Sequence, residues 1–105
     1  MKKEDKCYSA LGYNDLMLSF DKYLYGDGLA LSLFSRSEGQ FETISVNLTD
    51  EQLTDKDCFF VDTNNCPWAE SFLEDNGIAK PTGNLGFSGF CVYPEYRMVM
   101  DYEVK

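Results

Sequence analysis

The sequence predicts an α+β fold in which an antiparallel β-sheet of five to seven strands packs against one main helix near residues 66–76. The segment in this range, CPWAESFLEDNG, has a clear helical signature, because Trp68, Phe72 and Leu73 recur on one face of a helix. The remaining apolar residues occur in short, β-rich runs separated by turn residues, and a sheet built from these runs would cover that face. At 105 residues the chain has the size of one domain, so we expect a single domain over residues 1–105.

The beginning of the chain predicts a β-hairpin. Residues 6–10, KCYSA, read as a short strand, and residues 16–20, LMLSF, read as a second one. Residues 11–15, LGYND, are rich in turn formers and would connect the two strands.

Two further strands should continue this meander. Gly26-Asp27-Gly28 predicts a chain reversal, because glycine adopts positive φ angles without strain. Residues 29–36, LALSLFSR, alternate between a strongly apolar face and a mixed one, and Ser37-Glu38-Gly39 forms the next turn. Residues 41–48, FETISVNL, alternate in the same way. The side chains expected to point inward from this last strand are Ile44, Val46 and Leu48.

The predicted helix has recognisable ends. Asn65 or Cys66 would serve as its N-cap, with Pro67 in the first turn, where the missing N–H group is tolerated. Gly77 would end the helix, and residues 80–84, KPTGN, should form a rigid exit loop.

Other segments flank the helix. Residues 49–57, TDEQLTDKD, are acidic and predict either one helical turn or a loop, and residues 58–61, CFFV, predict a short buried strand. After the exit loop, residues 90–92 predict a strand, Pro94 marks an edge or a bend, and residues 96–102 predict the last strand.

The four cysteines are even in number, which in a secreted chain would suggest two disulfides. The N-terminus has no apolar signal-peptide region, and no run approaches the ~18 apolar residues of a membrane span, so we expect a cytoplasmic protein. Free thiols, buried or half-buried, are then expected in place of disulfides. The spacing of the cysteines matches no CxxC pair, and we expect no metal site. The cysteines are Cys7, Cys58, Cys66 and Cys91.

The charge balance bounds the kind of partner. The chain has 18 acidic and 9 basic residues, no histidine and a formal net charge of −9, while its aromatic share of 15% is too high for a disordered acidic tail. Such a chain repels phosphates, so direct binding to nucleic acid or to a membrane is disfavoured. A basic protein surface is the natural complement, and the alternative is that the charge serves only solubility.

The acidic residues concentrate in one stretch. Between residues 50 and 75, eight carboxylates and one lysine give a net charge of −7. Carboxylates displayed along one side of the molecule, at phosphate-like intervals, could occupy a channel that normally holds nucleic acid; the alternative is a solvated face without a partner. The predicted partner-binding residues are Asp50, Glu51, Asp55, Asp57, Asp62, Glu70, Glu74 and Asp75.

A second candidate interface lies near the C-terminus. Tyrosine and arginine are enriched at binding hot spots, which makes Tyr93, Tyr96 and Arg97 interface candidates. The alternative is that they are ordinary cross-strand pairs of a sheet.

Enzymatic and metal-dependent activities are not expected. The chain lacks histidine for base catalysis, a GxSxG motif and a glycine-rich phosphate loop. A calcium loop starting at Asp62 would need Gly and Glu at its sixth and twelfth positions, where the chain has Pro67 and Leu73. We therefore expect no catalytic residues, no metal and no cofactor.

Ordered short motifs resemble a known group of proteins. They are Val46-Asn47-Leu48, Gly77-Ile78, Pro81-Thr82-Gly83, Gly89-Phe90 and Tyr96-Arg97. As an ordered set, over about the last two thirds of the chain, these motifs resemble a family of short uncharacterised acidic proteins carried by phages and conjugative elements of Gram-positive bacteria. The resemblance implies a counter-defence context, in which some small acidic proteins are anti-restriction or anti-CRISPR inhibitors that mimic nucleic acid.

Two functions are therefore expected. The first is a non-enzymatic inhibitor that occupies the basic nucleic-acid-binding site of a host nuclease, with a CRISPR nuclease as one candidate. The second is a small adaptor of a phage or conjugative element that binds a protein through a sheet edge or its tyrosine-rich end, with charge serving only solubility.

Overall fold

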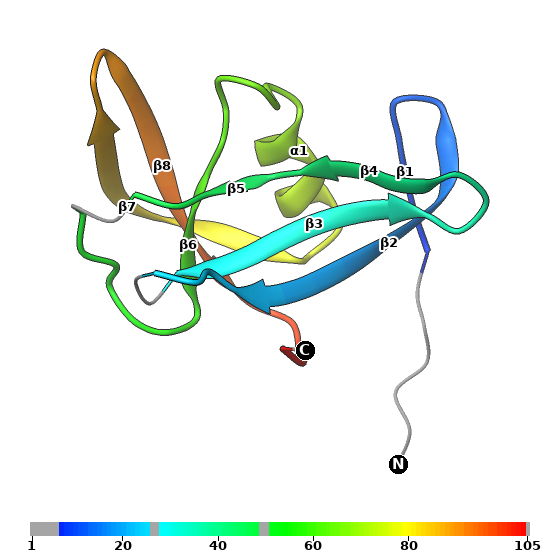
Figure 1. The fold of residues 1–105 in the computed structure, drawn as a ribbon, viewed down its shortest axis with the longest axis horizontal. Coiled ribbons are helices and arrows are strands. Elements are labelled where there is room, and N and C mark those ends of the chain that lie inside the picture. The colour runs from blue at the N-terminus through cyan, green and yellow to red at the C-terminus, as the bar shows by residue number, and fades with distance from the viewer. Residues whose placement is uncertain (1–6, 26–27, 49–50, 105) are drawn as a thin grey trace.

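A computed structural model describes residues 7–25, 28–48 and 51–104. Within these ranges the chain forms eight strands and one short helix, and the strands make two antiparallel sheets of four strands each (Figure 1). The α+β character with one helix agrees with the prediction. The expectation of one sheet with five to seven strands is wrong.

The first sheet is a meander in the order β1-β2-β3-β4. Its strands are β1 (Tyr8–Ala10), β2 (Tyr13–Lys22), β3 (Leu29–Ser35) and β4 (Gly39–Thr43). The predicted hairpin is confirmed, but its turn is shorter than expected. Leu11 and Gly12 both have positive φ, 52° and 88°, so two residues suffice to reverse the chain and β2 begins before Asp15. The predicted reversal at Gly26 and Asp27 lies outside the described residues.

The second sheet has the order β5-β6-β8-β7. Its strands are β5 (Ser45–Val46), β6 (Cys58–Val61), β7 (Ala79–Ser88) and β8 (Cys91–Met98). The two sheets separate at Ile44, which is fully buried and donates its N–H to the carbonyl of Leu31 in the first sheet. The strand predicted over residues 41–48 is thereby divided, so that β4 belongs to one sheet and β5 to the other.

The helix α1 (Ala69–Asp75) confirms the predicted position, while its N-terminal cap differs. Trp68 occupies the N-cap position, and its side chain makes no capping hydrogen bond, because the indole is a donor only and cannot accept a backbone N–H. The preceding residues form a turn in which Cys66 donates its N–H to the carbonyl of Asp62. The C-terminal end is as predicted. Gly77 has a φ of 65°, and the N–H of the next residue returns to the carbonyl of Leu73.

Two predictions after the helix are wrong. The expected exit loop over residues 80–84 is part of β7, where a shift in register between Pro81 and Leu85 accommodates residues that would otherwise disrupt a ladder. Pro94 lies within β8, and the strand predicted to Tyr102 ends at Met98. The acidic segment that precedes β6 forms bends and turns in its described part, residues 51–57.

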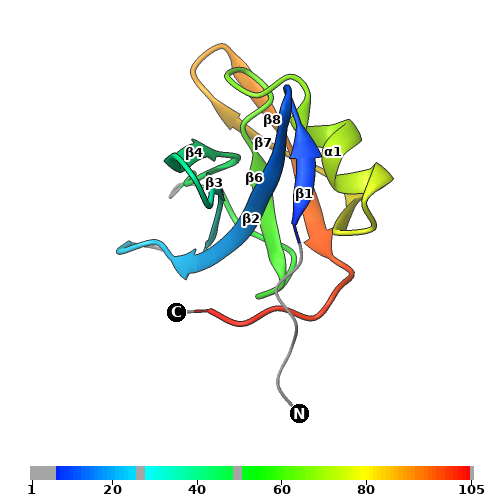
Figure 2. The same ribbon diagram turned by 90° about the vertical axis from the view of Figure 1, so that its right-hand side faces the viewer.

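The core lies between the two sheets and α1 (Figure 2). Alternate residues of β3 are buried, and the inner face of the second sheet contributes Phe59, Val61, Tyr96 and Met98. On α1, Phe72 contacts the ring of Tyr8 from β1 with a centroid distance of 5.7 Å. Within the described residues, no helix is long and apolar enough to cross a membrane.

Candidate functional site

The predicted carboxylates divide between the two sides of the second sheet. Tyr96 and Arg97 are neighbours in β8, so their side chains point to opposite faces. The Tyr96 hydroxyl donates to Glu70 at 2.9 Å and to Glu74 at 2.5 Å. Arg97 instead donates to Asp55. The carboxylates of α1 and those of residues 51–57 therefore belong to different sides of the molecule.

The helix group consists of Glu70, Glu74 and Asp75. Glu70 and Glu74 are one helical turn apart, and like charges at this spacing repel each other. The Tyr96 hydroxyl nevertheless hydrogen-bonds both carboxylates. Burial, together with the two hydrogen-bonded carboxylates, raises the pKa of Tyr96, so this hydroxyl keeps its proton and remains the donor. The last turn of α1 contains no basic residue, although the helix dipole favours a cation there. Glu74 and Asp75 thus place negative charge at the C-terminal end of α1, while Glu70 lies in its first turn.

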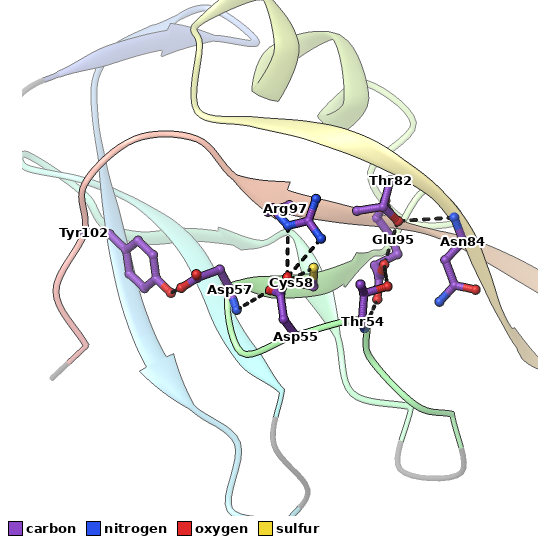
Figure 3. A network of polar contacts seen from close by, with 9 residues as sticks. All are labelled: Thr54, Asp55, Asp57, Cys58, Thr82, Asn84, Glu95, Arg97 and Tyr102. Carbon is purple, nitrogen blue, oxygen red and sulfur yellow. Dashed lines mark hydrogen bonds and ion pairs between the residues drawn. The ribbon is translucent and has the colours of Figure 1, made fainter.

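The loop group, Asp55 and Asp57, is held by the protein itself. Arg97 donates from Nε and Nη2 to Asp55 at 3.1 and 2.9 Å, and this is the ion pair of the described residues (Figure 3). The backbone N–H of Asp57, followed by Arg97, lowers the pKa of Asp55. The carboxylate of Asp57 accepts a hydrogen bond from the Tyr102 hydroxyl. These two acids anchor the segment that precedes β6.

The other predicted acids have separate local roles. Glu51 accepts the backbone N–H of Phe87 in β7 at 2.8 Å. Asp62 accepts hydrogen bonds from the backbone and the side chain of Asn65, at 3.2 and 2.9 Å, within the turn before α1. Asp50 lies outside the described residues. The described acids therefore do not form the single face that the nucleic-acid-mimic hypothesis requires of the whole set.

The two tyrosines of the second candidate interface are buried, so they offer little surface to a partner. Tyr93 is 8% exposed and Tyr96 is fully buried. Tyr96 belongs to the core between the sheets and α1, and Tyr93 lies on the opposite face of β8. Arg97 is partly exposed but paired with Asp55. These residues are cross-strand and internal partners, as in the alternative interpretation.

Glu95 is an internal carboxylate that no pattern in the sequence distinguishes from the other acids. It is fully buried and accepts hydrogen bonds from the Thr54 N–H at 2.7 Å, the Thr54 hydroxyl at 2.6 Å and the Thr82 hydroxyl at 2.6 Å (Figure 3). Burial by itself raises the pKa of Glu95, but the hydrogen bonds from Thr54, Thr82 and Asn84 outweigh this effect and lower it. The ionised carboxylate thus joins the acidic segment, β7 and β8.

The described residues contain no group of three or more His, Cys, Asp or Glu side chains arranged to hold a metal ion. Comparison with family models finds a match over residues 17–105, to a family described as a domain of unknown function, DUF4313. No curated protein and no solved structure is significantly similar to the chain.

Proposed function

Since the chain belongs to the DUF4313 family of unknown function, we propose its role from its own surface: it is a non-enzymatic protein that binds a partner protein with a basic, nucleic-acid-binding surface. The observation that carries this proposal is the helix group, Glu70, Glu74 and Asp75. Here a buried tyrosine hydrogen-bonds two like charges, Glu70 in the first turn of α1 and Glu74 in its last turn, and that last turn has no basic residue. The repulsion between Glu70 and Glu74, and the position of Glu74 and Asp75 in the last turn of α1, do not favour the stability of the helix.

The overall charge supports the same conclusion. The chain has 18 acidic and 9 basic residues and a formal net charge of −9. A body with this balance attracts basic surfaces over a distance of about 10 Å at moderate salt and accelerates their association. A cationic Lys or Arg of a partner would relieve the repulsion between Glu70 and Glu74.

In its finer form, the proposal is a counter-defence inhibitor of a phage or conjugative element, with a CRISPR nuclease as the candidate partner. Negative charge near α1 would compete with nucleic acid for the basic site of the nuclease. Inhibition of this kind needs no catalytic residue and no cofactor.

The experiment compares two charge reversals of equal size. Glu74→Lys with Asp75→Lys changes the helix group, and Glu38→Lys with Glu103→Lys changes exposed acids elsewhere. Each pair moves the formal net charge from −9 to −5, because two carboxylates become two ammonium groups. A partner captured from a nuclease-treated host lysate is identified and purified, and its affinity is measured by calorimetry between about 50 and 200 mM salt.

We expect the helix-group pair to lower the affinity at least about tenfold and to flatten its salt dependence, while the control pair has a smaller effect. Added DNA or guide RNA should displace the protein from the partner. Equal effects of the two pairs, or wild-type affinity that does not change with salt, would exclude a specific acidic site. A complex that holds nucleic acid and this protein together would exclude competition.

A second candidate is the adaptor, in which charge serves only solubility. The division of the carboxylates between two sides of the second sheet favours it, because a single continuous mimic of a nucleic acid would use one side. In this case neither charge reversal alters affinity beyond the general effect of net charge.

A further inference from the structure

The hairpin formed by β7 and β8 carries exposed apolar side chains that the protein's own core does not use. Figure 1 shows this hairpin extending beyond the neighbouring strands at the upper left. Phe87 and Val92 are directly paired, and Leu85 is paired with Pro94, so these residues share one face of the hairpin. The exposed side chains, here called the apolar stripe, are Leu85 (47% exposed), Phe87 (56%), Phe90 (108%) and Val92 (47%).

The hairpin presents the stripe on a defined backbone. Gly89 has a φ of 59° and is followed by Phe90, whose φ is not positive; this is the pattern of a two-residue type II′ turn. On the opposite face, Gly86 packs so closely that an added Cβ would lie 2.6 Å from Leu48 and 2.7 Å from Phe60. One face of the hairpin is therefore fixed against the protein while the other is exposed. A pre-organised backbone lowers the entropy cost of binding.

The geometry favours binding through side chains over the addition of a strand. β7 is the edge strand of its sheet, and the backbone N–H of Phe87 already donates to Glu51 at 2.8 Å. This carboxylate blocks one of the groups that an added strand would need. The side chains of the stripe remain exposed and accessible to a partner.

The stripe and the tyrosine that bonds the helix group lie on the same face of the second sheet. Residues 81–94 contain no charged residue, although the chain as a whole carries a formal net charge of −9. Val92 and Tyr96 point to the same face of β8, about 13 Å apart along the strand. The hydroxyl of Tyr96 is the donor shared by Glu70 and Glu74. An apolar surface is thus followed, on one face, by an acidic one.

We propose that the apolar stripe is the anchor through which the protein binds its partner, a basic protein that receives Phe90 in an apolar pocket bordered by Lys or Arg side chains. This inference rests on the proposed function, because charge complementarity identifies the partner as basic. The same charge disfavours a second copy of the chain or an anionic membrane as the occupant. Scattered exposed apolar residues need no explanation, but a contiguous stripe on a fixed hairpin indicates an interaction site.

The test removes similar amounts of exposed apolar surface at two places. Phe87→Ser with Phe90→Ser alters the stripe, and Leu24→Ser with Tyr25→Ser is the control, since Leu24 and Tyr25 are 87% and 72% exposed. Binding to the purified partner is measured as a function of salt for both variants. We expect the stripe variant to bind roughly 10- to 100-fold more weakly, with an unchanged salt dependence, and the control to bind like the wild type.

The outcomes separate this inference from the proposed function. Wild-type affinity in the stripe variant, with weakened binding by Glu74→Lys and Asp75→Lys, overturns the anchor alone. If the stripe variant loses binding and the charge reversal has no effect, the partner's pocket has no border of Lys or Arg side chains, and the proposed function is wrong. If light scattering shows a dimer that the stripe substitutions dissociate, the occupant of the stripe is a second copy of the chain and not a basic partner. If the protein floats with phosphatidylcholine vesicles and the stripe substitutions abolish this, the occupant is a membrane.

Discussion

Replacement of Glu95 by glutamine tests whether a buried charge holds the acidic segment to the second sheet. The substitution keeps the shape of the side chain and removes its charge. The introduced amide can still accept the Thr54 N–H with its carbonyl oxygen, and its NH₂ group can donate to the Thr54 and Thr82 hydroxyls once these rotate. The number of hydrogen bonds is therefore preserved, and only their charge assistance is lost.

The magnitude follows from these three hydrogen bonds. A hydrogen bond to a charged group contributes about 1.5–3 kcal/mol to stability, and a neutral one contributes about 1 kcal/mol. Because ionising a fully buried carboxylate also has a desolvation cost, part of the difference is offset. We expect Glu95→Gln to lower the free energy of unfolding by about 1–3 kcal/mol, and Glu95→Ala to lower it by more, because two threonines then lose their acceptor.

The assay is urea unfolding followed by the fluorescence of Trp68, at several pH values. The pKa of Glu95 is lower in the folded protein than its unfolded value of roughly 4.3, so its stabilisation is fully present above that value and is lost as pH falls through the folded pKa. The difference between wild type and Glu95→Gln should therefore be largest at neutral pH and should narrow in acid. If the difference in stability between the two proteins is constant with pH, or absent at neutral pH, the ionised Glu95 carboxylate does not stabilise the fold.

Two further predictions concern packing and thiol reactivity. Gly86→Ala should lower the free energy of unfolding by about 1–3 kcal/mol, because the new Cβ would lie 2.6 Å from Leu48. Exposed Ser88 lies on the same strand, and Ser88→Ala should have little effect. Thermal unfolding of both variants checks this, and equal stabilities would contradict the close packing at Gly86. Burial raises the pKa of the Cys58 and Cys66 thiols to about 11. A maleimide should therefore modify exposed Cys7 rapidly, and should modify Cys58 and Cys66 only after unfolding. Mass spectrometry of the native protein checks this, and rapid modification of Cys58 or Cys66 would be inconsistent with their burial.

Local sequence patterns predicted the strands and the helix that bury one face against a single neighbouring surface. The alternation in residues 29–36 predicted β3 nearly to its bounds, and the apolar spacing with Gly77 predicted α1 and its C-terminal end. The division into two sheets left no such signal. Ile44 continues the apolar alternation of the strand predicted over residues 41–48, so a change of sheet at that residue looks in sequence like an uninterrupted strand.

The candidate site depends on strand register, which the sequence does not display. The eight acids are close in sequence, but Glu74 and Asp55 bond to Tyr96 and Arg97, which lie next to each other much later in the chain. The opposite directions of these two side chains divide the acids. Glu95 left no signal either, because its burial depends on contacts with distant threonines. The exposed hairpin of β7 and β8 did leave a signal in the sequence, which is the long uncharged run over residues 81–94.

The strand β8 thereby determines which acids are available to a partner. On one of its faces, Arg97 and Glu95 hold the acidic segment, so the charge of Asp55 is compensated within the protein. On the other face, Tyr96 donates a single proton to the carboxylates of Glu70 and Glu74, which therefore keep most of their capacity to bind a cation. The apolar stripe lies farther along that second face. The proposed basic partner would thus gain most by approaching from the side of α1, where the carboxylates are least compensated within the protein and the proposed anchor lies on the same face.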